Sequence, residues 1–234
     1  MVDRPVRNIN GQAPILSRAM ATREWDALLE LGRPVTFSKG DTIMLHGSDG
    51  THMYLIREGR VEISITSAEG NKGVLNQMGP GEMLGEIALL DGGPRSADAV
   101  AASPVVALIA IDQGSVLRAL QGSPDVVVAV IRELCRRVRN ASEMFEVKSE
   151  KNAKVRLARA LLRLSAKWGE GTDNPKGARL LKGFSQSDLG DFAGLARENV
   201  NRHLKALQDE GLIARHDDGI TLLELDAIAD QAQL

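Results

Sequence analysis

The stretch 85–97, GEIALLDGGPRSA, combines residue types that could hold a small organic phosphate. Gly85 lets a backbone approach a ligand closely and allows a positive φ angle. Arg95 carries a planar fork of donors that suits a phosphate, and Glu86 offers an acceptor for a nearby hydroxyl group. The apolar turn after Gly85 would present free N–H groups at the start of a helix, where negative charge is favoured. The composition of this stretch alone is consistent with two interpretations. It could bind a phosphodiester with its ribose, or it could be a surface β-turn with a Glu–Arg pair, and composition favours neither.

A second group of polar residues follows a helix-turn-helix pattern in 184–213. Ser185 is a good N-cap for a first helix, and Asp188 occupies its capping-box position. Gly194 predicts a tight turn, after which a second helix begins at about Ala196 with apolar residues at helical spacing. In this motif the second helix is the one that reads DNA.

Two further elements accompany this motif. The run 151–163 contains five basic residues and no acidic one, and it predicts a helix that could add electrostatic support. The buried side of that helix is marked by Leu157, Leu161 and Leu164. The apolar runs 211–213 and 220–225 flank Asp217-Asp218-Gly219, which predicts a hairpin that forms a wing.

The composition limits the function. The 234-residue chain is 43% hydrophobic and 26% charged, which is typical of a globular protein with one large or two ordinary domains. Because its formal net charge is −2, any surface that binds nucleic acid must be local. The single cysteine, Cys135, precludes an internal disulfide, suits a reducing compartment and is expected to pack as a small residue.

The sequence has no pattern typical of catalysis, metal binding or membrane insertion. Its four histidines have no metal-ligand spacing and no hydrolase motif occurs, so we expect neither an enzyme nor a metal site. The longest apolar stretch, 99–111, is interrupted by Ser103-Pro104 and is too short to cross a bilayer. Because the N-terminus lacks the apolar core of a signal peptide, we expect a cytoplasmic protein without a membrane partner.

The residues of 85–97 must be positioned by the segment around them. From 35 to 111, short apolar segments alternate with glycine-bearing turns, which predicts an antiparallel roll or barrel. Two strand-like runs flank a turn at Glu58-Gly59, and VVALIAI at 105–111 is another strand. The stretch 85–97 is then an insertion between two strands, and 15–31 predicts a helix ahead of the roll.

The helix expected from Asp125 onward carries an apolar seam. Its members follow alternating steps of four and three, as in a heptad repeat: Val127, Ile131, Leu134, Val138, Ala141, Phe145 and Lys148. Such a stripe can pack against its own domain. Charged residues flank it closely, however, and its narrowness favours two copies paired about a two-fold axis.

Two motifs together resemble a known family. The order Gly-Glu, apolar turn and Pro-Arg-Ser-Ala resembles the phosphate-binding cassette of cyclic-nucleotide-binding domains. With ARENVNRHLKAL at 196–207, the chain resembles the cyclic-AMP receptor protein family (the CRP/FNR superfamily) over about 16–225. The resemblance implies an α+β protein with an N-terminal cyclic-nucleotide-binding β-roll (14–123), a long dimerisation helix (124–151) and a C-terminal winged helix-turn-helix DNA-binding domain (152–234).

The resemblance also implies roles for the cassette. In the family the glutamate holds the ribose 2′-OH, the arginine holds the cyclic phosphate and backbone amides add further bonds. These roles fall on Gly85, Glu86, Arg95, Ser96 and Ala97. Arg137 matches a helix arginine that can pair with the cassette glutamate. The base-contacting Thr-Ser pair of the family is replaced here by Ala141-Ser142, and Ser142 would reach the base from the other protomer.

Departures from the family pattern leave two nucleotides as candidate effectors. The hydroxyl that meets the adenine amino group is missing at Ala141. The cassette is one residue shorter than in the enterobacterial receptor and matches the domains of kinases and channels instead. Ser96 occupies the position where cGMP-binding domains often carry a hydroxyl residue that contacts guanine. We expect cAMP as the effector, with cGMP as the second candidate.

The recognition helix implied by the resemblance reads bases within a TGTGA-like half-site. Arg197 and Arg202 match guanine O6 and N7, and Glu198 accepts from cytosine N4. Contacts with DNA phosphates fall by position on Ser185, Gln186, Ser187 and Lys205. The expected partners are double-stranded DNA, a second copy of the chain through 124–148, and RNA polymerase, which relatives touch near 169–177.

Two alternatives are consistent with parts of this pattern. A redox or haem sensor of the same superfamily would need several cysteines or matched haem ligands, and the single Cys135 excludes an iron–sulfur cluster. A cyclic-nucleotide-binding module that controls a partner protein would lack a DNA-reading helix, and the 196–207 match argues against it.

Overall fold

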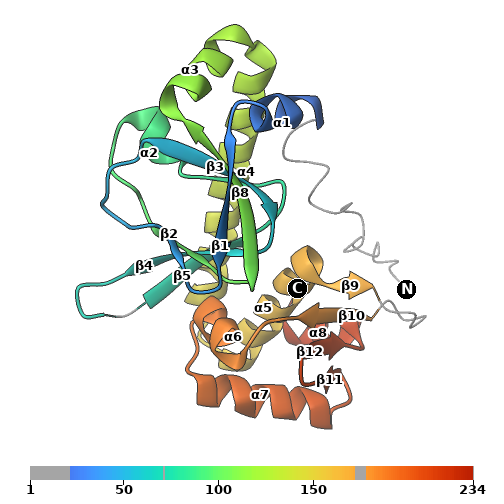
Figure 1. The fold of residues 1–234 in the computed structure, drawn as a ribbon. Helices are drawn as coiled ribbons and strands as arrows, with labels where there is room; N and C mark the ends of the chain where they lie inside the picture. Colours follow the sequence, from blue (N-terminus) through green and yellow to red (C-terminus); the bar gives the residue numbers. More distant parts are fainter. Residues whose placement is uncertain (1–21, 71, 172–177, 234) are drawn as a thin grey trace, which may run out of the picture.

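The computed structural model describes residues 22–70, 72–171 and 178–233, which form a β-rich N-terminal part, one long helix and a smaller C-terminal part (Figure 1). This is the mixed α and β architecture expected from the sequence. The helix predicted over 15–31 is present as α1 (Thr22–Leu29), and residues 15–21 lie outside the described ranges.

The N-terminal part is a roll of two antiparallel sheets. One sheet has the strand order β1-β8-β3-β6 and the other β2-β7-β4-β5. The inner faces share an apolar core that includes Ile56, Val61 and Leu108, which confirms the predicted roll. The strands are β1 (Arg33–Ser38), β2 (Thr42–Met44), β3 (His52–Glu58), β4 (Val61–Thr66), β5 (Lys72–Met78), β6 (Met83–Leu84), β7 (Asp98–Ala101) and β8 (Val105–Asp112).

The turn predicted at Glu58-Gly59 forms, but the strands on its two sides belong to different sheets. Gly59 has a φ angle of 85°, a region that favours glycine, and a Cβ there would collide with the carbonyl oxygen of Val105. β3 pairs with β8 and β6, whereas β4 pairs with β7 and β5. The chain therefore crosses from one sheet to the other at this glycine.

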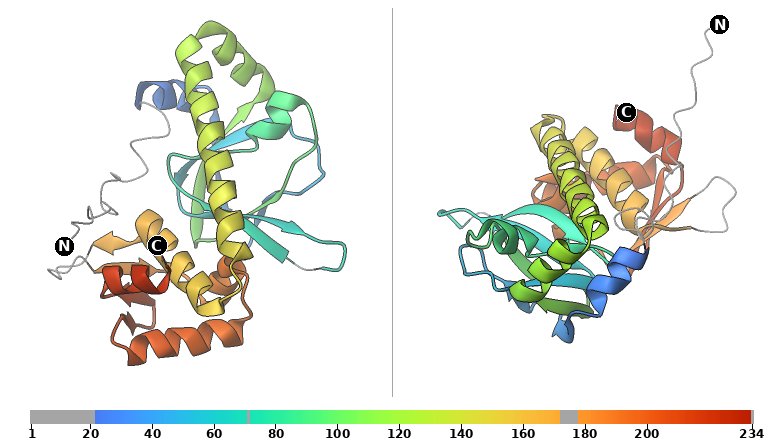
Figure 2. Two further views of the ribbon diagram at one scale, coloured as in Figure 1. Left: turned by 180° about the vertical axis from the view of Figure 1, so that it is seen from behind. Right: turned by 90° about the horizontal axis from the view of Figure 1, so that it is seen from above.

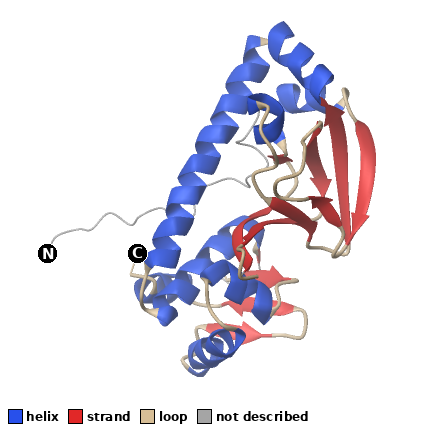
Figure 3. Ribbon diagram, turned by 90° about the vertical axis from the view of Figure 1, so that its left-hand side faces the viewer, coloured by secondary structure: helices blue, strands red, loops and turns tan. Residues whose placement is uncertain are grey.

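A long helix connects the two parts of the molecule. After α3 (Gln113–Gly122), α4 (Pro124–Ser149) runs along one side of the roll to the C-terminal part (Figures 2 and 3). Ser123 caps the helix, because its Oγ accepts the N–H of Val126, and Pro124 occupies the first turn. Apolar residues near its start pack against the roll, and Met144 and Val147 near its end are buried.

The opposite face of α4 exposes most of the predicted heptad seam. Ile131, Val138 and Phe145 are 52%, 68% and 75% exposed. Cys135 beside the seam is also exposed, so the expectation that it packs as a small residue is wrong within a single chain. Lys148, the last seam member, is half-buried, and its Nζ donates to the Val74 carbonyl of the roll at 2.6 Å.

The C-terminal part packs its helices against a small sheet of strand order β11-β12-β10-β9. Leu157, Leu161 and Leu164 lie buried in its core, as the pattern of the basic helix predicts. The elements are α5 (Ala153–Trp168), β9 (Glu170–Gly171), β10 (Arg179–Lys182), α6 (Gln186–Ala193), α7 (Arg197–Asp209), β11 (Ile213–Arg215), β12 (Gly219–Leu222) and α8 (Leu225–Gln231).

The helix-turn-helix pattern is confirmed in its local details. The Ser185 side chain accepts from the N–H of Asp188, whose side chain accepts from the N–H of Ser185, so both bonds of the capping box form. Gly194 ends α6 with a φ angle of 65°, and α7 begins directly after Ala196. The predicted wing is the hairpin of β11 and β12.

The end of the wing differs from the prediction. The apolar run 220–225 is not one strand, because β12 ends at Leu222 and α8 begins at Leu225. Leu222 is buried in the core of the C-terminal part and Leu225 packs against that core, which explains why this segment is apolar without being one strand. In the loop 169–177, Glu170 and Gly171 form β9, and residues 172–177 lie outside the described ranges.

Candidate functional site

A cavity of about 230 Å³ lies between the roll and α4, and most of the predicted cassette residues line it. Of the predicted ligand residues, those on its wall are Gly85, Glu86, Arg95, Ser96, Ala97, Arg137 and Ala141. Ser142 is exposed and does not line this cavity; its Oγ donates to the Val138 carbonyl at 3.1 Å. The fold thus brings 85–97 next to the middle of α4. The helix α2 (Glu86–Asp91) forms the first half of this stretch.

Gly85 is required by the geometry of the cassette. It is the N-cap of α2 and has a φ angle of 80°, in the left-handed region. A Cβ at this position would collide with Nη1 of Arg95 and would lie 2.9 Å from the sulfur of Met44. Glycine therefore serves both the turn and the close approach of the arginine.

The Gly85→Ala variant is expected to lose about 1–2 kcal/mol of stability from the left-handed backbone and, in addition, to displace Arg95. Gly92→Ala is the matched control, because Gly92 has a φ angle of 73° and open space where a Cβ would be. Urea unfolding should show a lower free energy of unfolding for both variants. Calorimetric titration with cyclic nucleotides should show weaker binding in Gly85→Ala alone. Equal nucleotide binding by the two variants would contradict this role for Gly85.

Arg95 is a buried cation held by carbonyl groups. Only 6% of its surface is exposed, and Nη1 donates to the Gly85 carbonyl and Nη2 to the His52 carbonyl, each at 2.7 Å. No carboxylate of the described residues lies within ion-pair distance of it. Burial lowers the pKa of Arg95 from its ordinary value, but a guanidinium stays protonated in proteins. Its charge can therefore attract an anion in the cavity.

Glu86 presents an unused acceptor in the same cavity. It is 1% exposed, and its Oε1 accepts from Nη1 of Arg137 at 2.5 Å, which confirms the predicted ion pair. Its Oε2 is buried and has no hydrogen-bond partner within the described part of the chain. A buried acceptor without a donor costs about 1–3 kcal/mol. A ligand hydroxyl that donates to Oε2 would remove this cost.

The cavity also contains residues that the sequence analysis missed. Asn76 of β5 and Asn140 of α4 add two carboxamides, and apolar side chains that include Met44 and Ile63 complete the wall. A signal for Asn140 exists, because it follows Arg137 by three residues and therefore shares its helix face. Asn76 has no comparable signal, since its position depends on how β5 lies against α4.

The predicted DNA-contacting residues lie on α6, on its N-cap Ser185 and on α7, at the end of the molecule distant from the roll's α2 (Figure 1). The predicted base readers Arg197, Glu198 and Arg202 are all exposed on α7, and Lys205 is exposed as well. Nη2 of Arg202 donates to Oδ1 of Asn199 at 2.8 Å. Exposed donors and acceptors on one helix can reach base edges in a major groove.

A groove of about 690 Å³ joins the start of α6, the start of α7 and the wing. Of the predicted residues it contains Ser185, Gln186, Ser187 and Arg197, whereas Glu198, Arg202 and Lys205 lie outside it. Arg215 of the wing strand also lines it and donates to Oδ1 of Asn201 at 3.3 Å. Arg215 was not among the DNA-contacting residues predicted from the sequence, although a basic residue beside a predicted hairpin was a signal for it.

Comparisons with known proteins match both parts of the chain. Residues 34–123 match the family model of the cyclic nucleotide-binding domain, and residues 155–230 match that of the Crp-like helix-turn-helix domain. The chain is 32% identical over 198 residues to the cyclic AMP receptor protein of Thermus thermophilus, which covers 85% of this chain and 87% of that protein. It is 27% identical over 207 residues to the CRP-like cAMP-activated global transcriptional regulator of Mycobacterium tuberculosis, with 88% and 91% covered.

A solved structure agrees with these relatives. The crystal structure of a transcriptional regulator of the CRP/FNR family from Thermus thermophilus superposes with a TM-score of 0.70 at 28% identity. The match covers 86% of this chain and 99% of that one. Among the described helices, none has both the length and the apolar character needed to span a membrane.

Proposed function

The chain belongs to the CRP/FNR family of transcriptional regulators, and from this premise we propose that it is a homodimeric transcription factor whose DNA binding responds to cAMP. One observation carries the proposal. Among the described residues, Arg95 is a buried cation with no carboxylate within ion-pair distance, Oε2 of Glu86 is a buried acceptor with no donor, and both residues line the same cavity. An anionic phosphate attached to a hydroxyl-bearing ribose satisfies both groups.

Each part of the nucleotide has a proposed partner. The cyclic phosphate pairs with Arg95 and the backbone N–H groups of Ser96 and Ala97, and the ribose 2′-OH donates to Glu86. The base then lies toward Ala141 of α4, which lines the cavity. The names of the two relatives favour cAMP. The hydroxyl of Ser96, exposed at the cavity wall, supports cGMP as the second candidate.

Calorimetric titration of the full chain with cAMP and with cGMP tests this assignment. Selection of bound DNA from a random pool, with cAMP, with cGMP and with neither, then tests the response. We expect a palindromic TGTGA-like site to be enriched with cAMP and not without a nucleotide. Equal absence of binding by both nucleotides would refute the proposed effector class.

The proposed dimer pairs two copies through 124–148 of α4. The exposed seam residues Ile131, Val138 and Phe145 support it, since burial of this apolar surface against a second copy would stabilise the pair. In such a pair Ser142, which does not line the cavity of its own chain, would approach the cavity of the partner. A nucleotide between the roll and α4 would favour one arrangement of the helix pair. The junction near Asn152 would then set the two recognition helices about one DNA turn apart.

The proposed DNA contacts divide between bases and phosphates. Arg197 and Arg202 read guanine and Glu198 reads cytosine, whereas Ser185, Gln186, Ser187 and Lys205 contact phosphates. RNA polymerase is a proposed further partner.

The Arg197→Ala variant is expected to lose roughly 1–3 kcal/mol of specific DNA binding and to relax the preference at one guanine. Lys205→Ala is the comparison, because loss of a phosphate contact should weaken binding about equally for all sequences and lower the salt slope by about 1. Fluorescence anisotropy with a matched site and with single-base variants measures both effects. An unchanged guanine preference in Arg197→Ala would refute the base-reading role.

A further inference from the structure

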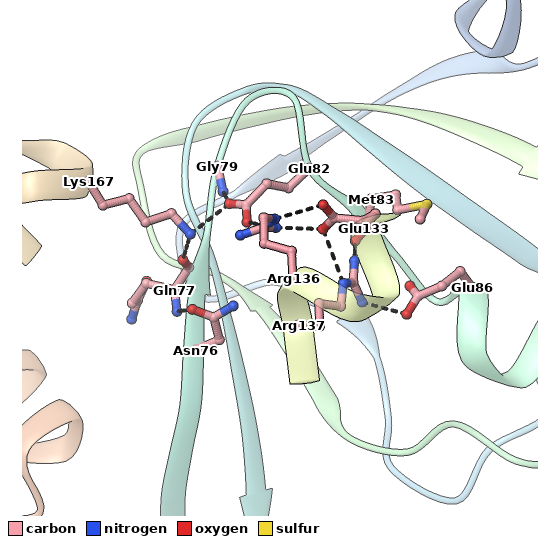
Figure 4. A network of polar contacts seen from close by, with 10 residues as sticks. All are labelled: Asn76, Gln77, Gly79, Glu82, Met83, Glu86, Glu133, Arg136, Arg137 and Lys167. Carbon is pink, nitrogen blue, oxygen red and sulfur yellow. Dashed lines mark hydrogen bonds and ion pairs between the residues drawn. The ribbon is translucent and has the colours of Figure 1, made fainter. Parts of the chain in front are cut away.

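A continuous series of ion pairs runs from the proposed nucleotide pocket to α5 of the C-terminal part (Figure 4). We call it the relay, and its members in order are Glu86, Arg137, Glu133, Arg136, Glu82 and Lys167. The successive nitrogen–oxygen distances are 2.5, 3.3, 2.5, 2.6 and 2.7 Å. Glu86 belongs to α2 and Glu82 to the loop before β6, so the relay crosses from the roll to α4, back to the roll and on to α5.

The relay is charge-balanced and its carboxylates are buried. Three carboxylates alternate with three cations, and Glu82, Glu86 and Glu133 are 1%, 1% and 2% exposed. Loss of one member of a buried ion pair leaves the other charge uncompensated, which is strongly destabilising. A change in the partners of one member is therefore expected to change the positions of its neighbours.

Glu82 is the member that connects the two parts of the chain. Its Oε1 accepts from Arg136, and its Oε2 accepts from Lys167 and from the N–H of Gly79 at 2.7 Å. Burial raises the pKa of Glu82, but the charges of Lys167 and Arg136 outweigh burial and hold the pKa below its ordinary value. Lys167 also donates to the Gln77 carbonyl at 2.5 Å, so its ammonium group is held at the end of β5.

Trp168, the residue after Lys167, forms the apolar side of the contact between the roll and α5. A Cβ at Gly79 would collide with the Trp168 ring, so the ring lies directly against this backbone. The guanidinium carbon of Arg60 lies 3.8 Å from the ring centre of Phe184 and 5.9 Å from that of Trp168. Since α5 shares one apolar core with α6 and α7, a displacement of α5 would move the DNA-reading helix with it.

We propose that the relay transmits the occupancy of the nucleotide pocket to the DNA-binding domain, with Glu82, Arg136 and Lys167 as positioning residues that touch no ligand. The ligand assigned to the pocket rests on the proposed function. Arg137 is shared by Glu86, Glu133 and the Met83 carbonyl. A hydroxyl donor at Glu86 therefore alters how Arg137 is shared, and Glu133 and Arg136 pass the change to the contact between Glu82 and Lys167.

The first experiment needs no ligand. The chain has two tryptophans, and replacing the other one by Trp25→Phe leaves Trp168 as the only reporter at the far end of the relay. Glu86→Gln removes the charge at the pocket end while keeping the shape of the side chain. We expect this change to alter acrylamide quenching of Trp168 fluorescence, and we expect Lys167→Met to abolish that response.

Two further variants separate the relay from general effects on folding. Lys154→Met changes the same residue type on α5, where Lys154 pairs at 3.0 Å with Glu210 in an exposed position, and should leave the response intact. Lys167→Arg keeps the cation and should restore it. The relay is refuted if Glu86→Gln changes the quenching of Trp168 by the same amount with Lys167→Met as without it. It is also refuted if Glu86→Gln does not change the quenching in either protein.

The second experiment measures the ratio of DNA affinities with and without cAMP. We expect Lys167→Met to reduce this ratio by at least about fivefold, the lower end of common coupling between sites, while cAMP binding itself persists. A ratio in Lys167→Met equal to that of the wild type would overturn the proposal. If the quenching response follows the relay but cAMP leaves wild-type DNA binding unchanged, the effector assignment fails and the relay stands.

Discussion

The Arg95→Ala variant is expected to stay folded and dimeric but to bind cAMP at least about 30-fold more weakly, because truncating one partner of a buried charge pair costs roughly 2 kcal/mol or more. No carboxylate of the described residues lies within ion-pair distance of Arg95, and the charge of Glu86 acts on it from farther away, so a bound phosphate would be its nearest counter-charge. Without ligand binding, the stimulation of DNA binding by cAMP should disappear.

Calorimetry and anisotropy on the full chain measure the two losses. Because Arg95 also donates to the carbonyls of Gly85 and His52, Arg95→Gln is the second variant, since it removes the charge and shortens the side chain but keeps an amide donor. Arg57→Ala is the matched control, as Arg57 is exposed and lies outside the cavity wall. Wild-type operator affinity with a full response to cAMP in both Arg95 variants would refute the phosphate site.

The Val138→Glu variant is expected to convert the protein from a dimer to a monomer. In a parallel two-fold pair of α4 helices, each seam residue lies near its own copy, so this change places two carboxylates against each other in an apolar interface. Desolvating an ion costs several kcal/mol, and a loss of about 3 kcal/mol weakens the dimer more than 100-fold. DNA binding at a palindromic site should fall with it.

Sedimentation velocity over a range of concentrations measures the change in oligomeric state. Arg139→Glu is the control, because it introduces the same residue one position away, on an exposed part of α4 outside the seam. This control should remain dimeric. A wild-type protein that is monomeric at all concentrations, or a Val138→Glu variant that is still dimeric, would contradict pairing through the seam.

Local patterns predicted most of the elements. Glycines between short apolar runs marked the strands of the roll, and the capping box at Ser185 with the turn at Gly194 predicted α6 and its end. The heptad spacing predicted a long helix, and α4 exposes most of the apolar stripe. The pattern failed at 220–225, because a short apolar run indicates burial without distinguishing a strand from the start of a helix.

The candidate site was predictable where its residues are close in sequence. Gly85, Glu86, Arg95, Ser96 and Ala97 share one motif, and all five line one cavity. The relay was not predictable, because Glu82 and Lys167 are far apart in the sequence and belong to different parts of the molecule, although they form an ion pair. The sequence contains both charged residues, but no pattern in it indicates that they form a pair.

The sequence by itself determined the family, the periodic elements and the motif that could bind a phosphate. These features depend on neighbours within a few residues, where spacing and backbone preference decide the geometry. Only the tertiary structure decided that β3 and β4 enter different sheets, that Asn76 reaches the cavity and that Lys167 reaches Glu82. Such contacts depend on the path of the whole chain and on which charges become buried together, and neither is encoded in a local pattern.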